Sequence, residues 1–157
     1  MYIDTNIFVY VALKHPDFYD SCLEVLEMLV EGHFKGCGSN FVVFELFGSL
    51  ARLNPLAAYE AVKAYLQLPI TLLELDDRAL EYARDIAERA RVTYDAIHAG
   101  LMARHGIEVV VTEDLRDWLK IARAWQQLEK RHGWRPLTVY SPTRGPIVVD
   151  DNKVDKY

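Results

Sequence analysis

Hydrophobic and polar positions along the chain follow two periods, one typical of short buried strands and one typical of amphipathic helices. The opening residues are apolar up to Ile3 and are followed by Asp4, two small polar residues and a second apolar run. This pattern predicts a buried strand, a turn and a helix over roughly residues 5–13. The same reasoning predicts six further helices: two over 17–31 and 77–90, three that begin at 41, 55 and 93, and one that ends at 132. It predicts further strands near 32–38, 69–75, 106–112 and 137–140.

Strands and helices alternate through the whole chain, and no internal repeat, low-complexity segment or linker divides it. Its 157 residues are a usual length for one domain and can bury a sizeable core. Alternation of this kind predicts an α/β domain whose parallel sheet is covered by helices on both faces. Residues 141–157 contain two prolines and a charged end, and we expect a surface tail there.

The composition is that of an ordinary globular protein, with 51% hydrophobic and 26% charged residues. No apolar run approaches the roughly 20 residues that span a membrane. The opening lacks the features of a secretion signal because Asp4 interrupts it, so we expect a cytoplasmic protein without membrane contact. The two cysteines, Cys22 and Cys37, are too few for a disulfide framework or a zinc site.

The formal net charge of −5 argues against bulk attraction to nucleic acid, although a basic rim can coexist with an acidic metal pocket. Asp4 would stand just beyond the carboxyl end of the first strand, where open α/β sheets bind ligands. Capping of the next helix is the alternative role for this side chain.

Glu45 is a lone carboxylate in a predicted helix that is apolar nearly all round and that we therefore expect to be buried. Burying an unpaired charge costs several kcal/mol. An ion pair with a residue such as Arg52, or exposure on a narrow polar edge, would relieve that cost. The pattern favours a functional role over both alternatives.

Two further carboxylates lie where strands and helices meet. Asp95 falls in the first turn of its helix, where Thr93 can already supply the cap. Asp114 follows a strand in the same layout as the chain opening. One turn further on, Asp117 either points to the same place or caps its helix, and His98 is expected to be a packed residue outside the site.

Asp4, Glu45, Asp95 and Asp114 would repel one another strongly if they converged without a cation. Carboxylates are ligands of Mg²⁺, and Mn²⁺ suits the same oxygen atoms. Such an ion can activate a water and neutralise a phosphate. The chain has no P-loop, no dinucleotide-binding glycine motif and no Gly-x-Ser-x-Gly elbow.

Four short motifs stand in a characteristic order: Ile3-Asp4-Thr5-Asn6, the Glu45 helix with its preceding Ser39, Tyr94-Asp95-Ala96-Ile97-His98-Ala99, and Val111-Thr112-Glu113-Asp114. Together they resemble the PIN-domain family, in particular the VapC-type toxins of prokaryotic toxin–antitoxin pairs. The resemblance covers residues 1–140, and Asp117 lies slightly off the spacing expected for a further acid of the family.

The resemblance implies a PIN-like three-layer α/β/α sandwich with a central parallel sheet, a nuclease domain over 1–140 and a C-terminal tail over 141–157. It implies Mg²⁺- or Mn²⁺-dependent cleavage of single-stranded RNA, a small antitoxin partner and a homodimer. The catalytic acids that it implies are Asp4, Glu45, Asp95 and Asp114. Asp4, Asp95 and Asp114 would be direct metal ligands, Glu45 would act through water or as the base, and Asn6 and Thr112 would brace the pocket.

Two other functions remain open at this point. The chain is a PIN-like binding or assembly module without catalysis, or it is an RNA-maturation or DNA-flap nuclease outside any toxin–antitoxin pair. The presence of all four acids argues against the first alternative. A short antitoxin-like reading frame directly upstream would argue against the second.

Overall fold

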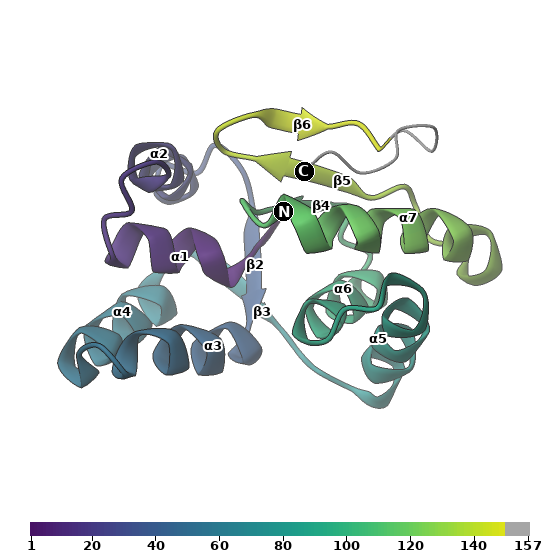
Figure 1. Ribbon diagram of the computed structural model, residues 1–157, viewed down its shortest axis with the longest axis horizontal. Coiled ribbons are helices and arrows are strands. Elements are labelled where there is room, and N and C mark those ends of the chain that lie inside the picture. The colour runs from purple at the N-terminus through teal and green to yellow at the C-terminus, as the bar shows by residue number, and fades with distance from the viewer. Residues whose placement is uncertain (150–157) are drawn as a thin grey trace.

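The computed structural model describes residues 1–149, which form one sheet with helices on both faces (Figure 1). Within these residues the strands are β1 (Tyr2–Ile3), β2 (Gly36–Ser39), β3 (Ile70–Leu73), β4 (Val109–Val111), β5 (Thr138–Ser141) and β6 (Gly145–Ile147). The helices are α1 (Thr5–Ala12), α2 (Tyr19–Val30), α3 (Asn40–Ala51), α4 (Pro55–Gln67), α5 (Asp77–Ala90), α6 (Tyr94–His105) and α7 (Leu115–His132).

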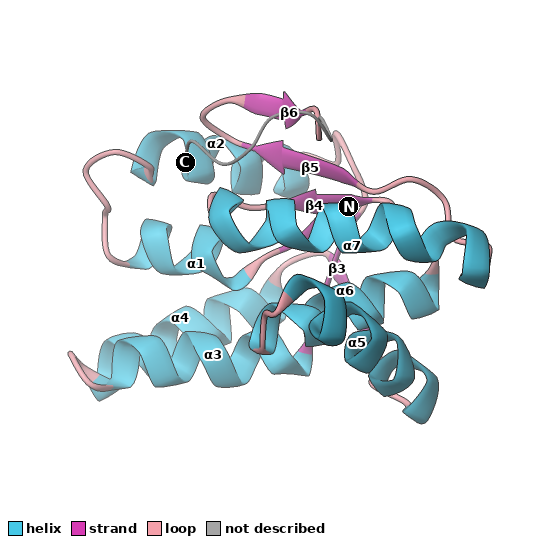
Figure 2. Ribbon diagram, turned by 45° about the vertical axis from the view of Figure 1, so that its right-hand side comes forward, coloured by secondary structure: helices cyan, strands magenta, loops and turns pink. Residues whose placement is uncertain are grey.

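The strand order is β3-β2-β1-β4-β5-β6, and all neighbours pair in parallel except β5 and β6, which form an antiparallel hairpin. The chain runs outward from β1 to β3 and then returns to β4 on the other side of β1. Because crossovers between parallel strands are right-handed, this reversal places the two groups of helices on opposite faces. Figures 1 and 2 show α1–α4 on one side of the strands and α5–α7 on the other. The predicted three-layer α/β/α architecture is therefore confirmed.

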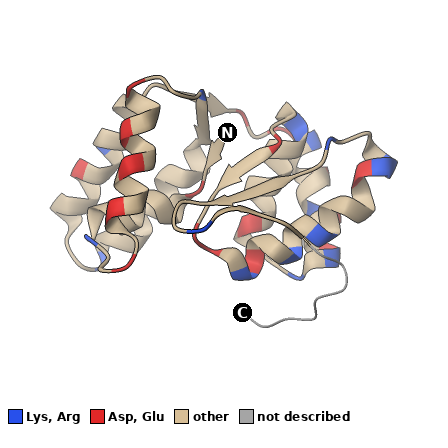
Figure 3. Cartoon of the chain, turned by 90° about the horizontal axis from the view of Figure 1, so that it is seen from above, with Lys and Arg blue, Asp and Glu red and all other residues tan. Residues whose placement is uncertain are grey.

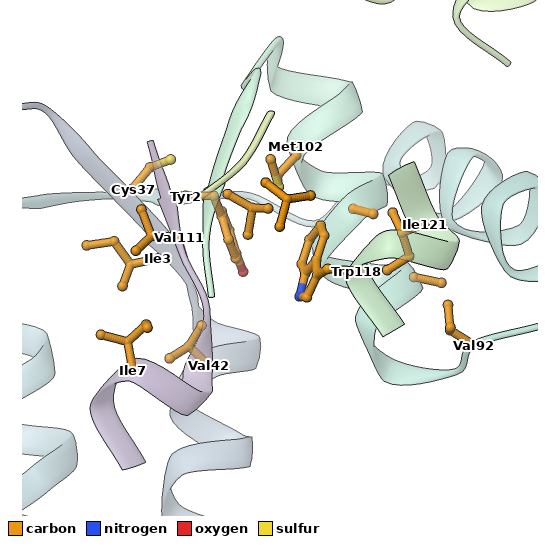
Figure 4. Packing of buried hydrophobic residues seen from close by; sticks show 14 of the residues in the cluster. Tyr2, Ile3, Ile7, Cys37, Val42, Val92, Met102, Val111, Trp118 and Ile121 are labelled. Atoms are coloured by element: carbon orange, nitrogen blue, oxygen red, sulfur yellow. The ribbon is translucent and has the colours of Figure 1, made fainter. Parts of the chain in front are cut away.

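The first strand lies in the middle of the sheet and sends its side chains to opposite faces. Tyr2 and Ile3 are both fully buried. Figure 4 shows Ile3 on the side of Ile7, whereas Tyr2 points to the side of Met102 and Trp118. Two hydrophobic layers thus meet at β1 and fix the position of the residue that follows it.

Helices α5 and α6 approach each other closely at Gly100. A Cβ atom at this position would lie 2.4 Å from the backbone oxygen of Ala79 and 2.8 Å from the Cβ atom of Ala83. Only glycine fits such a contact without a backbone shift. Gly100 therefore allows the close packing of α5 and α6.

The prediction that α3 is buried all round is wrong. Val42, Leu46 and Leu50 face the core, but Phe44 is 73% exposed and Phe47 is 45% exposed. On the adjacent α4, Ala58 and Tyr65 are buried, whereas Leu56, Tyr59 and Leu66 are exposed. The two helices pack on each other, so each turns only one stripe to the core.

Residues 141–147 form the end of β5, a turn and β6, and not the expected surface tail. Ser141 ends β5, and β6 pairs with β5 after a tight turn. Glu113 anchors this turn by accepting hydrogen bonds from the Thr143 backbone N–H at 2.7 Å and from the Ser141 hydroxyl at 2.9 Å. The rest of the predicted tail, 150–157, lies outside the described residues.

Asp85 is a buried charged residue on α5. The residue is only 5% exposed and accepts hydrogen bonds from Arg84 at 2.7 Å and from His132 at 3.1 Å. Because His132 comes from the end of α7, these contacts join α5 to α7.

Cys22 and Cys37 are both buried and free. Among residues 1–149, none of the helices has the length and apolar character that a membrane span requires.

Candidate active site

Strands β1 and β4 end side by side in the sheet. Ile3 pairs with Val111, so Asp4 and Thr112 follow at the same level, and the Asp4 backbone N–H donates to the Val111 carbonyl at 3.0 Å. The direction of strand addition reverses between these two strands. Open α/β sheets bind ligands at such a reversal, beyond the carboxyl ends of the strands.

The Asp4 carboxylate is held by four hydrogen bonds and is 3% exposed. Its Oδ1 accepts from the Thr5 backbone N–H at 2.7 Å. Its Oδ2 accepts from the Asn6 amide at 2.7 Å, the Thr112 hydroxyl at 2.7 Å and the Trp118 indole N–H at 2.8 Å. These donors come from both strand ends and from α7, so the carboxylate has a fixed orientation.

Asn6 and Thr112 connect the two strand ends, as the resemblance implied. The Asn6 amide also donates to the Thr112 hydroxyl at 2.8 Å and accepts from the Glu113 backbone N–H at 3.1 Å. The Thr112 hydroxyl in turn accepts from the Asp114 backbone N–H at 3.0 Å. This network fixes the start of α7 relative to Asp4.

Three other acids form a second group beside these strand ends. Three carboxylate oxygens, one each from Asp95, Asp114 and Asp117, lie within 4.8 Å of one another. Asp95 is in the first turn of α6, and Asp114 caps α7 by accepting from the Asp117 backbone N–H at 3.3 Å. Asp117 also accepts from the Lys120 ammonium at 2.5 Å.

Burial and mutual repulsion make this group unfavourable when it is fully charged. Burial, followed by the charges of Asp4 and Asp114, raises the pKa of Asp95 from 3.8 to about 7. Burial also raises the pKa of Asp114, with repulsion from Asp117 and Asp4 contributing. A set of clustered carboxylate oxygens with such uncompensated repulsion fits a hard divalent cation.

Glu45 reaches the same region from α3, and its partners are Thr5 and His98, not Arg52. The Thr5 hydroxyl donates to Glu45 Oε2 at 2.5 Å, and His98 Nε2 lies 2.8 Å from the same oxygen. Burial by itself would raise the pKa of Glu45, but the hydrogen bonds and charge of His98, together with Thr5, lower it. The carboxylate is therefore ionised at neutral pH.

His98 is fully buried between the sheet and the pocket. Its Nδ1 lies 2.6 Å from the Tyr2 hydroxyl, which lies 3.0 Å from the Ser39 hydroxyl. Burial would lower the pKa of His98, but the hydrogen bond to Glu45 and the charges of Asp4, Glu45 and Asp95 raise it.

The four predicted acids line a single open pocket of about 710 Å³. Asp4, Glu45, Asp95 and Asp114 thus come together from four separate parts of the chain. The remaining lining residues are Thr5, Asn6, Val9, Tyr10, Gly48, Ser49, Arg52 and Tyr94.

Sequence reasoning missed three features of the site. His98 was placed outside it, although its position one turn after Asp95 was a usable signal. The Trp118 contact with Asp4 had no signal beyond helical spacing from Asp114, and Asp117 was left undecided. The prediction that Thr93 caps α6 is wrong, because its side chain makes no capping hydrogen bond.

Comparison with known proteins gives matches at the level of family and fold. A family model described as PIN domain matches residues 1–124. The structure is similar to VapBC2 from Rickettsia felis bound to a DNA fragment from its promoter, with a TM-score of 0.61 and 18% identity over 89% of this chain and 96% of that chain. It is also similar to DNA-bound VapBC from Salmonella typhimurium, with a TM-score of 0.62 and 21% identity over 90% of this chain and 96% of that chain. A search of curated proteins returned no significant match.

Proposed function

The chain belongs to the PIN-domain family, and from this premise we propose that it is a metal-dependent endoribonuclease that cleaves single-stranded RNA as the toxin of a toxin–antitoxin pair. One observation carries the proposal: Asp4, Glu45, Asp95 and Asp114 line one pocket at the reversal point of the sheet. Repulsion between the carboxylates of this pocket is relieved when a cation binds. A cleft with only a structural role would have no use for such a cluster of acids.

The proposed cofactor is Mg²⁺, with Mn²⁺ able to replace it. We assign Asp4, Asp95 and Asp114 to holding the ion, and the geometry adds Asp117 to this group. When bound, the ion supplies charge neutralisation at the phosphate and activation of water.

The chain's own residues orient the reaction. Both donors to Glu45 bind its Oε2, so within residues 1–149 no hydrogen-bond donor occupies Oε1. This free oxygen of an ionised, pocket-lining carboxylate would accept a hydrogen bond from the attacking water. Asp4, fixed by its four donors, holds one wall of the pocket in place during the reaction.

The surface around the pocket fits a single-stranded polyanion. Arg52 lines the pocket and would bind a phosphate, and Tyr94, which is 66% exposed, offers a ring on which a base can stack. Helix α7 carries Arg116, Lys120, Lys130 and other basic residues, whereas α2 carries Asp and Glu and no basic residue (Figure 3). The basic residues of α7 would therefore help to hold RNA despite the net negative charge.

The proposed protein partner is a small antitoxin, and the proposed assembly is a homodimer in the cytoplasm. The two similar structures are VapBC assemblies. Helices α3 and α4 expose large apolar side chains, including Phe44 and Leu56, next to the pocket-lining residues of α3. Apolar side chains gathered on one helix pair are typical of a protein interface.

The test is cleavage of labelled single-stranded RNA by purified protein, followed on a denaturing gel in Mg²⁺, Mn²⁺ or EDTA. Asp95→Asn is the preferred inactive variant because, within residues 1–149, the Asp95 carboxylate accepts no hydrogen bond that the substitution would disturb. Asp17→Asn, at an exposed acid that does not line the pocket, is the matched control.

We expect cleavage in both metals, none in EDTA, none with Asp95→Asn and unchanged cleavage with Asp17→Asn. Absence of cleavage in both metals by antitoxin-free protein would refute the nuclease function. Cleavage by Asp95→Asn at the normal rate would remove this acid from the mechanism.

A further inference from the structure

A buried series of hydrogen bonds connects the carboxyl end of β2 to the pocket. It runs from Ser39 at the end of β2 through Tyr2 on β1 and His98 on α6 to Glu45 on α3. Tyr2 and His98 are fully buried, and Ser39 is 2% exposed. Buried polar groups of this kind need hydrogen-bond partners, so we expect the four side chains of this series to be ordered together.

We propose that His98 is a positioning residue, which Tyr2 and Ser39 hold in one orientation so that its Nε2–H fixes the orientation of the Glu45 carboxylate in the pocket. The inference rests on the proposed nuclease function for its effect on catalysis, and on the hydrogen-bond geometry alone for the arrangement itself.

The position of one proton follows from the donors and acceptors that are present. An ionised Glu45 can only accept, so the 2.8 Å contact requires a proton on His98 Nε2. Nδ1 lies 2.6 Å from the Tyr2 hydroxyl, which donates to it when the ring is neutral and accepts from it when the ring is charged. A hydrogen bond of 3.0 Å between the Tyr2 and Ser39 hydroxyls completes the series.

Ser39 is itself fixed at the far end of this chain. Its backbone N–H donates to the Tyr65 hydroxyl at 3.0 Å, and that hydroxyl donates to the Ser39 carbonyl at 3.0 Å. Tyr65 is 1% exposed and comes from α4. Three elements of the fold, β1, β2 and α4, therefore hold the ring of His98 through Tyr2.

Two hydrogen bonds hold one oxygen of Glu45, Oε2, in place. Thr5 and His98 approach Oε2 from α1 and α6, so the carboxylate cannot rotate without losing both hydrogen bonds. Oε1 is left as the oxygen available to the pocket. Loss of the His98 contact would free the side chain of Glu45, which is only partly covered at 24% exposure.

The test is a double-mutant cycle in single-turnover RNA cleavage at saturating RNA, with His98→Met and Glu45→Gln. A residue that acts through Glu45 matters only while the Glu45 carboxylate is present. We expect His98→Met to lower the rate about 10- to 100-fold in the parent protein, as for other residues that orient catalytic ligands. In the Glu45→Gln background we expect a change of at most about twofold.

Two companion variants separate positioning from packing. His98→Gln keeps an N–H near the position of Nε2 and should recover most of the cleavage rate that His98→Met loses. Tyr2→Phe keeps the ring packing but removes the hydroxyl, so it should lower the cleavage rate in part. His33→Met is the control, since His33 pairs with Glu31 on the surface. Equal losses from His98→Met in both backgrounds, or no recovery with His98→Gln in a folded protein, would overturn the proposal.

The nitrogen-15 spectrum of His98 in the metal-free protein tests the arrangement without any cleavage. We expect a protonated, exchange-protected Nε2, and Tyr2→Phe should change the Nδ1 resonance. A proton found only on Nδ1 would overturn the inference even in an active nuclease. If the unmodified protein cleaves no RNA but shows the protonated Nε2, the proposed function fails and the positioning of Glu45 stands.

Discussion

Asp95 should destabilise the metal-free protein, and its replacement by Asn should make the protein more stable. The pKa of Asp95 rises from 3.8 to about 7 on folding, because of burial and then the charges of Asp4 and Asp114. At about 1.4 kcal/mol per pKa unit this rise corresponds to about 4 kcal/mol. Asp95 is only partly buried and water screens its charge, so we expect about 2 kcal/mol.

The sign of the pH dependence follows from the proton balance. Between pH 4 and 7 the unfolded chain has released the Asp95 proton while the folded protein still binds it, so the free energy of unfolding falls as pH rises. Above pH 7 both states are ionised and the full cost is present. The stability gained by Asp95→Asn should therefore be close to zero near pH 4, grow through this window and level off above pH 7.

The assay is urea unfolding in EDTA from pH 4 to 8.5, followed by the fluorescence of the buried Trp118 and Trp125. The quantity of interest is the difference in unfolding free energy between Asp95→Asn and the parent, with Asp17→Asn as the matched exposed control. Millimolar Mg²⁺ should reduce this difference, because a bound ion stabilises the parent. A variant less stable than the parent at pH 8 in EDTA, or a pH-independent difference, would refute the reasoning.

Two further predictions concern the hydrogen bond from Trp118 to Asp4 and the close packing of α5 and α6. Trp118→Phe removes the indole donor to Asp4, so we expect about 1–3 kcal/mol lower stability in urea unfolding and a lower cleavage rate; unchanged values for both would show that the hydrogen bond is dispensable. Gly100→Ala forces a Cβ atom to 2.4 Å from the Ala79 carbonyl, so we expect about 1–3 kcal/mol lower stability. Gly48→Ala, which meets nothing within 4 Å, is its helical control and should not lower stability; equal effects of the two substitutions would contradict the close packing of α5 and α6.

Much of the fold was predictable because local pattern determines local structure. Periods of two and of 3.6 residues located the strands and helices, with ends that shifted by a few residues. The sequence predicted that Asp4 and Asp114 would lie at the same edge of the sheet, because Asp4 directly follows one strand and Asp114 closely follows another. Both residues line the candidate site. Glu45 stood out because a charge in an apolar helix requires a partner.

Only the tertiary structure decided which partners these residues have. His98 meets Tyr2 across 96 positions and Glu45 across 53, and no spacing along the chain encodes either contact. The order and register of the strands bring these residues together. For the same reason the exposed Phe44 could not be distinguished from a core residue until α3 and α4 were placed.

Sequence by itself determined the kinds of element, their order along the chain and the chemistry of the acids at their junctions, because these depend on neighbouring residues. Tertiary structure decided that Asp117 joins the acidic group, that Oε2 of Glu45 is clamped and that residues 145–147 extend the sheet. These features depend on distances between segments far apart in sequence. Such distances are set by the packing of whole elements, which no single stretch of the chain contains.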